Sequence, residues 1–472
     1  MSFGVDYTMT IGGEPVGSTR KIDVINPATE QVFASVPDAT AEDLDRAVAA
    51  AQRALPGWRA TPFAERAQAL RRAAELLEAH ADALAELFTK EQGRPFEGAK
   101  QEILGAAFWF RLTAKMSVPV DVVEDTPARR VEVHHEPLGV VCAIVPWNFP
   151  ILLAAWKIAP ALLTGNTMVL KPSPFTPLCT LRLGELLREA LPPGVLNVIT
   201  GGDALGPMMT SHAGFAKISF TGSTATGKRV MASAAQDLKR ITLELGGNDA
   251  AIVFGDVDVA QVAEQIFFGA FHNTAQVCVA TKRLFIHDSI YDEMRDRLHA
   301  LAKQLKVGDG ADPQSVFGPL QNEPQYRRVR ALIDEARADG LTLLDGGAVP
   351  DRGYFIPLTL VDNPPDTARV VAEEAFGPVL PLLRFSDVDE VVARANDTEY
   401  GLAGAVWSKD VDLALAVAKR LDTGTVWINQ NLQSTPMIPL AGHKHSGFGV
   451  ENGLAGLLEY TQPKSIFIPK PV

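Results

Sequence analysis

This 472-residue chain has few of the features that mark membrane, nucleic-acid-binding or secreted proteins. Its longest apolar runs, such as residues 139–146, are as long as a strand, whereas a membrane-spanning helix needs about 20 apolar residues. Acidic residues number 56 and basic residues 44, and the net charge of −12 argues against nucleic acid or an anionic membrane as a partner. Neither class of function is therefore expected.

Cysteine is also scarce, and the three that occur are Cys142, Cys179 and Cys278. An odd and sparse set does not make a disulfide framework, and it fits a reduced, cytoplasmic protein. The first residues lack the basic and apolar regions of a signal peptide, which agrees with a cytoplasmic location. The histidines at 134–135 and at 443 and 445 lack partners at the spacing of a metal site, so we expect no metal.

The hydrophobic pattern indicates an α/β protein of more than one domain, because a chain of this length is too long for one core. A helical layer is predicted first, with a capping box at Thr40-Ala41-Glu42-Asp43 and one helix from Thr61-Pro62 to near Gly93. Strands and helices alternate over residues 139–258, which is typical of a doubly wound parallel sheet with ligands at the carboxyl ends of its strands. A second alternation follows residue 258.

Residues 118–137 differ from the rest, because their valines alternate on both sides of a turn at Thr126-Pro127. The pattern predicts a β-hairpin without a helix to cover it. Such an edge must be covered, either by its own domain or by another subunit, and the pattern leaves both possibilities open.

Two stretches carry chemistry. Cys278, within Gln276-Val277-Cys278, can attack a carbonyl carbon, and Glu244, within Leu243-Glu244-Leu245-Gly246-Gly247, can activate water. Together they supply the two halves of an acyl-enzyme cycle, although a single cysteine is more often a small core residue. The turn Phe220-Thr221-Gly222-Ser223 joins a strand to a helix, and it is either an anion site or a plain tight turn.

These stretches, taken in order, resemble the signatures of the aldehyde dehydrogenase superfamily over almost the whole chain. The fold that the resemblance implies is α/β, with two doubly wound Rossmann-like domains and a small β-hairpin oligomerisation arm. The expected cofactor-binding domain covers residues 1–117 and 138–246, the catalytic domain 247–440, and the arm 118–137 and 463–472. The motifs are Pro146-Trp147-Asn148-Phe149-Pro150, Lys171-Pro172, Phe220-Thr221-Gly222-Ser223, Leu243-Glu244-Leu245-Gly246-Gly247, Gln276-Val277-Cys278 and Glu373-Glu374-Ala375-Phe376-Gly377-Pro378-Val379.

The resemblance implies NAD(P)-dependent oxidation of an aldehyde to the carboxylic acid. Cys278 would attack as a thiolate, so we expect the site to favour the anion. The Asn148 side-chain amide and the Cys278 backbone N–H would hold the oxyanion, and Glu244 would activate the water that hydrolyses the thioester.

The resemblance also assigns the cofactor side. Lys171 resembles the family's lysine that holds the adenosine ribose. Many family members have a glutamate three residues after this lysine, where it clamps the ribose 2′-hydroxyl and repels a 2′-phosphate. This chain has Pro174 there. We therefore expect NAD as the main cofactor, with NADP accepted more readily than usual. The expected cofactor-binding residues are Val145, Pro146, Trp147, Lys171, Gly222, Ser223, Gly246, Glu374 and Phe376.

The substrate is less well defined. Phe149, Trp156 and Leu440 match apolar tunnel positions of the family, and His272 either shapes the tunnel or packs as a polar residue. We expect an uncharged aliphatic or aromatic aldehyde. A semialdehyde dehydrogenase and a CoA-acylating aldehyde dehydrogenase are the alternatives. The arm implies a homodimer or a homotetramer.

Overall fold

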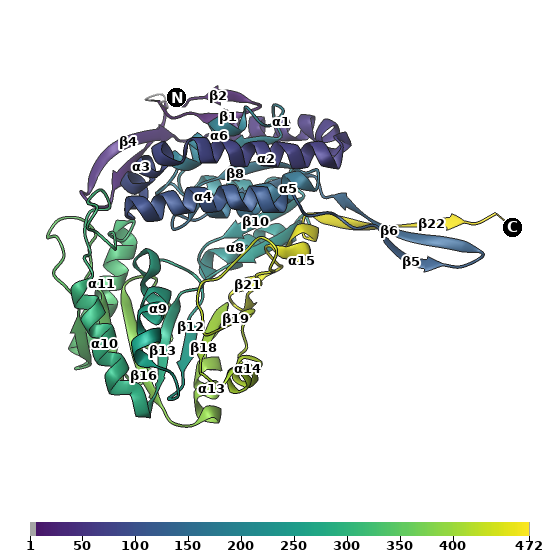
Figure 1. Cartoon of the computed structure of the whole chain (residues 1–472). Helices are drawn as coiled ribbons and strands as arrows, with labels where there is room; N and C mark the ends of the chain where they lie inside the picture. The colour runs from purple at the N-terminus through teal and green to yellow at the C-terminus, as the bar shows by residue number, and fades with distance from the viewer. Residues whose placement is uncertain (1–5, 472) are drawn as a thin grey trace.

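The computed structural model describes residues 6–471 and contains two large, mainly parallel sheets, one above the other in Figure 1. The first sheet has eight strands in the order β2-β1-β9-β8-β7-β10-β11-β21. Its strands are β1 (Met9–Ile11), β2 (Glu14–Val16), β7 (Val140–Ile144), β8 (Thr167–Lys171), β9 (Leu196–Val198), β10 (Lys217–Thr221), β11 (Arg240–Glu244) and β21 (Gly447–Phe448). The chain winds outward from β7 in both directions, so the predicted doubly wound α/β fold is confirmed.

The helical layer predicted for residues 40–117 lies over this sheet. It contains one more helix than the sequence predicts. The capping box begins α1 as predicted, because Thr40 and Asp43 exchange hydrogen bonds between side chain and backbone. The single helix expected from Thr61-Pro62 to Gly93 is wrong, because the chain leaves helical geometry at His80. The helices on this sheet are α1 (Ala41–Ala60), α2 (Phe63–Ala79), α3 (Ala81–Gln92), α4 (Phe96–Thr113), α5 (Pro150–Leu163), α6 (Leu178–Leu187), α7 (Leu205–Ser211) and α8 (Thr224–Ala235).

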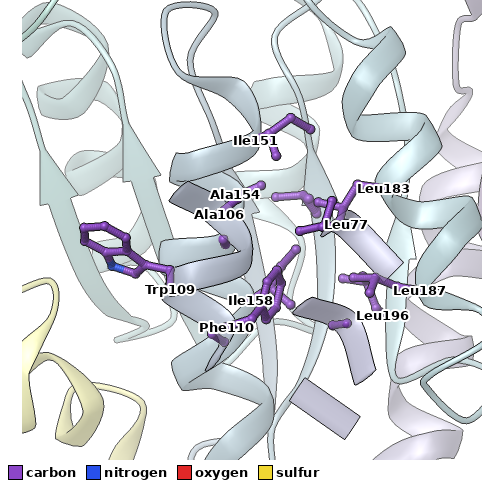
Figure 2. Packing of buried hydrophobic residues seen from close by; sticks show 14 of the residues in the cluster. Leu77, Ala106, Trp109, Phe110, Ile151, Ala154, Ile158, Leu183, Leu187 and Leu196 are labelled. Carbon is purple, nitrogen blue, oxygen red and sulfur yellow. The ribbon is translucent and has the colours of Figure 1, made fainter. Parts of the chain in front are cut away.

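Helix α5 is the buried centre of this half of the molecule. Apolar side chains surround it, as expected for a helix that packs on all sides. Figure 2 shows Ile151 and Ile158 of α5 among side chains from α2, α4, α6 and β9. Burying each large aliphatic side chain contributes about 1.5–3 kcal/mol relative to leaving it exposed. The packing fixes the start of α5, which directly follows Asn148 and Phe149.

The second sheet has seven strands in the order β14-β15-β16-β13-β12-β18-β19, and only β14 pairs antiparallel to its neighbour among the described residues. The sequence predicts the second alternation only after residue 258, whereas β12 of this sheet begins earlier, at Asp249. The strands are β12 (Asp249–Val253), β13 (Thr281–His287), β14 (Thr342–Asp345), β15 (Thr359–Asp362), β16 (Val379–Phe385), β18 (Ala403–Trp407) and β19 (Thr425–Ile428).

Six helices accompany the second sheet, and the chain returns to the first sheet near its end. The helices are α9 (Val259–Phe271), α10 (Tyr291–Gln304), α11 (Glu323–Ala338), α12 (Arg369–Ala372), α13 (Val388–Asn396) and α14 (Val411–Ala418). The chain crosses from β11 to β12 between Glu244 and Asp249, and β21 then pairs with β11. The smaller elements are β3 (Lys21–Asn26), β4 (Gln31–Pro37), β17 (Tyr400–Gly401), β20 (His443–Lys444) and α15 (Gly453–Leu458).

A three-stranded sheet extends away from the body of the molecule in Figure 1. It consists of the predicted hairpin, β5 (Asp121–Asp125) and β6 (Arg129–Pro137), and of β22 (Thr461–Pro469), which pairs with β6 along its whole length. We call these strands the arm. Its exposed apolar side chains include Val123, 62% exposed, and Phe467, 64% exposed. The outer part of the hairpin therefore does not fold back on its own domain.

Candidate active site

Cys278 lies in a tightly held loop between α9 and β13. The three residues Asn273, Thr274 and Ala275 all have left-handed backbone geometry, with φ of 52°, 56° and 59°. This is costly for residues other than glycine, and above all for the β-branched threonine. Tertiary hydrogen bonds hold the strained turn. Thr274 Oγ1 donates to the Gly318 carbonyl at 2.9 Å, and the side-chain oxygen of Gln276 accepts from the Gln321 N–H at 2.9 Å.

Asn148 is fixed beside this loop, immediately before α5. Its side-chain Nδ2 donates to the Gln276 carbonyl at 2.9 Å, and the side chain is almost fully buried. Its backbone carbonyl accepts from the Asn273 side chain at 3.3 Å and from the Arg94 guanidinium at 2.5 Å. An amide nitrogen carries two hydrogens, so one N–H of Asn148 remains for another acceptor.

A buried ion pair supports Asn148. The pair is Arg94 with Glu102. The sequence did not show this role, because Arg94 stands in a stretch that indicates only the end of a helix. Arg94 and Glu102 lie 2.8 Å apart. Glu102 Oε1 also accepts from the N–H groups of Ile151 at 3.0 Å and Leu152 at 3.2 Å, and so caps the start of α5. The Arg94 guanidinium lies 4.3 Å from the centre of the Phe149 ring.

A cavity of about 510 Å³ opens onto Cys278 and Asn148. The predicted substrate residues Phe149, Trp156 and His272 line it, whereas Leu440 does not. Leu440 instead pairs with Glu451 through its backbone and packs against the core, so its assignment to the cavity is corrected. Sequence reasoning missed much of the wall, which includes Leu152, Leu153, Gln265, Phe268, Gly269, Val277, Val279, Gln430, Asn431, Leu432, Gln433 and Ser434.

The wall of this cavity is neutral. Among the described residues that line it, none is an aspartate, glutamate, lysine or arginine. His272 stacks on Phe149 with the ring centres 6.2 Å apart, and its ring is open to the cavity. Enclosure by protein and the Arg94 guanidinium lower the pKa of His272 below its usual value, so the ring is uncharged near pH 7. Trp156, which also lines the cavity, stacks on Trp109 with the ring centres 5.3 Å apart. This contact fixes the orientation of the Trp156 ring.

Glu244 ends β11 and is buried. Burial raises the pKa of its carboxyl group well above 4.5, the nearby Glu451 carboxylate raises it further, and the Lys157 ammonium opposes both effects. Lys157 and Glu451 form an ion pair at 2.8 Å with both side chains 1% exposed. Within residues 6–471, Glu244 Oε1 has no hydrogen-bond partner. A buried, unpaired carboxyl oxygen is costly, and such groups mark functional sites.

The protein groups around Cys278, taken together, disfavour the thiolate that the resemblance leads us to expect. Burial raises its pKa to about 12. The Lys282 ammonium lowers this pKa, but the carboxyl groups of Glu244, Glu374 and Asp249 raise it. The motifs named Glu244 and Glu374 for other roles and did not indicate Asp249. The fold brings all three carboxyl groups near the thiol.

A second cavity, of about 620 Å³, lies at the ends of β8 and β10 and the start of α8. Lys171 lines it together with Asp203 and Arg229. Burial lowers the pKa of Lys171 to about 8, although the Asp203 carboxylate opposes the change. Gly222 and Ser223 lie at the adjoining start of α8, where Ser223 caps the helix. Val145 joins the same region, because its N–H donates to the Lys171 carbonyl at 3.1 Å.

Four more of the predicted cofactor residues make two contacts in the structure. The Gly247 N–H donates to Glu374 Oε1 at 3.2 Å. A Cβ at Gly246 would lie 2.3 Å from Glu374 Oε2, so a side chain there would displace this carboxylate. The rings of Trp147 and Phe376 are perpendicular, with centres 5.4 Å apart. The structure therefore brings Gly246, Glu374, Trp147 and Phe376 together in two contacts.

Two further observations concern other classes of protein. Within the described chain, no group of three or more histidine, cysteine or acidic side chains is arranged to hold a metal ion. Over the same residues, no helix is both long and apolar enough to cross a membrane.

Comparison with known proteins gives one consistent result. A family model described as the aldehyde dehydrogenase family matches residues 15–466. The chain is 42% identical to an aldehyde dehydrogenase from a Fusarium species, covering 98% of both chains. It is also 42% identical to a chloroplastic betaine aldehyde dehydrogenase from Beta vulgaris, covering 96% of this chain and 94% of the other. The NAD+ complex of an aldehyde dehydrogenase from Bacillus cereus has a TM-score of 0.96 and 36% identity, covering 98% and 96% of the two chains.

Proposed function

This chain belongs to the aldehyde dehydrogenase family, and on that premise we propose that Cys278, Asn148 and Glu244 convert an aldehyde to its carboxylic acid. The observation that carries the proposal is the cavity that Cys278 and Asn148 both line, because the Asn148 amide keeps one N–H without an acceptor among the described residues. The carboxyl group of Glu244 is close enough to raise the pKa of the Cys278 thiol, which supports its role beside the same cysteine.

The chemistry follows from these groups. The Cys278 thiolate attacks the carbonyl carbon, and the resulting oxyanion accepts hydrogen bonds from Asn148 Nδ2 and the Cys278 backbone N–H. NAD held at Glu374 and Lys171 would supply the hydride acceptor, and loss of the hydride from the same carbon would leave Cys278 as a thioester. Glu244 takes a proton from water, the hydroxide adds to the thioester, and the acid departs as the thiolate reforms.

The proposed cofactor is NAD, and the residues present fit it. Glu374 offers two carboxylate oxygens for ribose hydroxyls beside Gly246, where a larger residue would displace the carboxylate. Lys171, with Gly222 and Ser223 at the helix start, provides a cation and N–H donors for the adenosine and pyrophosphate end. The solved neighbour from Bacillus cereus is an NAD+ complex.

We further propose that NADP is accepted. Pro174 stands in place of the clamping carboxylate, and Arg229 and Lys171 both line the cavity against the single carboxylate of Asp203. Comparing kcat/KM with the two cofactors tests this claim. A preference for NAD above about a thousandfold, or about 4 kcal/mol, would contradict it.

The proposed substrate is an uncharged aliphatic or aromatic aldehyde. The neutral wall of the cavity offers no counter-ion, among the described residues, to a carboxylate or an ammonium group. The test is steady-state kinetics over benzaldehyde, a medium-chain aldehyde, succinic semialdehyde and betaine aldehyde. We expect the two uncharged aldehydes to have the highest kcat/KM. A clear advantage for succinic semialdehyde or betaine aldehyde would refute the assignment.

A CoA-acylating reaction is the competing proposal within the family. It needs no base to activate water, whereas Glu244 is present and buried at the end of β11. Measuring NADH formation with and without CoA separates the two reactions. We expect full turnover without CoA, with the free acid as product.

We also propose that the chain assembles as a homodimer or homotetramer through the arm, whose apolar side chains would pack on a neighbouring subunit. The cytoplasmic location expected from the sequence belongs to this proposal as well. The three cysteines are all free thiols in the structure, as a reducing compartment requires.

A further inference from the structure

We propose that Lys282 is a positioning residue of this site, whose ammonium group orients the Cys278 loop and supplies a positive charge to the thiol. The proposal rests on the proposed role of Cys278 as the nucleophile. Lys282 is the second residue of β13, and its side chain is 7% exposed.

The short contacts of Lys282 are with the backbone that carries Cys278. Its Nζ donates to the carbonyl oxygens of Cys278 at 2.7 Å, Val277 at 2.8 Å and Ala280 at 3.2 Å. An ammonium group has three N–H donors, and three carbonyls take them up.

One of these contacts aims the oxyanion donor. The Val277 carbonyl and the Cys278 N–H belong to the same peptide group, which is planar and trans, so the two bonds point in opposite directions. When Lys282 binds the carbonyl, the N–H is directed to the opposite side. No acceptor among residues 6–471 takes this N–H, so it is available to an oxyanion.

The charge of Lys282 acts on the same atoms. The groups that face the Cys278 thiol are the Lys282 ammonium and the carboxyl groups of Glu244, Glu374 and Asp249. The ammonium lowers the pKa of the thiol and the three carboxyl groups raise it. Lys282 Nζ also lies 3.7 Å from Glu374 Oε1, the carboxylate proposed to hold the cofactor ribose. Charges this close interact strongly in a buried site.

The test replaces Lys282 with methionine, which keeps an unbranched apolar stem without the charge, and with arginine, which keeps the charge. The first readout is the rate of Cys278 alkylation by iodoacetamide against pH, followed by mass spectrometry of the labelled peptide. The second is kcat and KM for the aldehyde and for NAD. Lys303→Met, at an exposed position on α10, is the control for the loss of one positive charge.

We expect Lys282→Met to raise the apparent pKa of alkylation and to slow alkylation about tenfold or more at a fixed pH below that pKa, because the thiolate is the reacting form. We expect kcat to fall about 100-fold through the misdirected oxyanion donor. Lys282→Arg should keep an alkylation profile near that of the unchanged protein and lose part of kcat. Lys303→Met should change neither readout.

An unchanged alkylation profile and kcat in Lys282→Met would overturn the proposal. If Lys282→Met does not fold, Lys282→Gln, which retains two N–H donors without charge, gives the same comparison. Cys278→Ala separates the two proposals. If it retains turnover, the proposed function fails; if it abolishes turnover while Lys282→Met behaves as the unchanged protein, only the role of Lys282 fails.

Discussion

At the scale of single residues, burial works against the two groups that must lose a proton in the proposed reaction. Cys278 must be a thiolate and Glu244 a carboxylate, yet burial raises the pKa of both. Three carboxyl groups near the thiol add to the effect, and Lys282 opposes it. The protein groups around Cys278 therefore oppose its thiolate form on balance.

The raised pKa values of Cys278 and Glu244 predict how kcat/KM depends on pH. Both groups must lose a proton, and both have pKa values above their ordinary range, so the active fraction grows as the pH rises. We expect kcat/KM to increase from about pH 6 to about pH 9 and not to pass through a maximum near pH 7. The measurement is a pH–rate profile with the best aldehyde of the panel. A flat profile over this range would show that neither group titrates in the reaction.

The residue scale also shows what the sequence could predict. Local motifs identified Cys278, Asn148 and Glu244, because each has a characteristic neighbourhood. They could not predict the charge state of Cys278, which depends on Glu374 and Asp249 from other parts of the chain. The support of Asn148 by Arg94 likewise became visible only when distant segments met. Leu440 does not line the cavity, because its backbone pairs with Glu451 and its side chain packs against the core.

At the scale of elements, the start of α5 links the core to the site. The helix is locked by apolar packing, and Glu102 caps its first turn while pairing with Arg94. Asn148 directly precedes this turn, so its position depends on the same contacts. The packed and capped start of α5 therefore holds Asn148, the proposed oxyanion donor, in a fixed position.

We predict that Glu102→Ala lowers the free energy of unfolding by about 3–5 kcal/mol, because it leaves the Arg94 charge buried without its partner. Activity should also fall at temperatures where the variant is folded. Chemical denaturation with an activity assay measures both. Glu78→Ala is the matched control, because Glu78 pairs with Arg111 at the surface and its loss should cost about 0–1 kcal/mol. Equal losses in the two variants would contradict the role given to Glu102.

Elements with strong local signals were predictable. The capping box begins α1 as expected, and the arm hairpin turns where Thr126-Pro127 indicated. The break at His80 was not predictable, because the apolar period continues across it. The start of the second sheet was not predictable from alternation, because β12 is buried along its whole length.

At the scale of the whole molecule, the arm is the feature that a single chain leaves uncovered. Its apolar side chains lie on strands that extend from the body in Figure 1, and exposed strand edges invite pairing. Two of its strands, β6 and β22, are distant in sequence and yet pair over nine residues each, which gives the arm a fixed shape. A fixed apolar surface of this kind is suited to a subunit interface.

We predict that Val123→Asp together with Phe467→Asp lowers the oligomeric mass measured by light scattering, because each substitution buries a charge in the proposed interface. Leu238→Asp is the control, because Leu238 is 88% exposed and lies outside the arm. The oligomeric mass of this variant should equal that of the unchanged protein. An unchanged mass in the arm variant would exclude the arm as the interface.

The central claim is that Cys278 carries the acyl group and that Glu244 releases it. Glu244→Gln keeps the size of the side chain and removes the base, so the thioester should accumulate. We propose to incubate this variant with NAD and the best aldehyde and to record its intact mass. We expect one rapid equivalent of NADH, a mass increase equal to one acyl group on Cys278, and hydrolysis slowed about 100-fold or more. Undiminished turnover without an adduct, or an adduct on another residue, would contradict the claim.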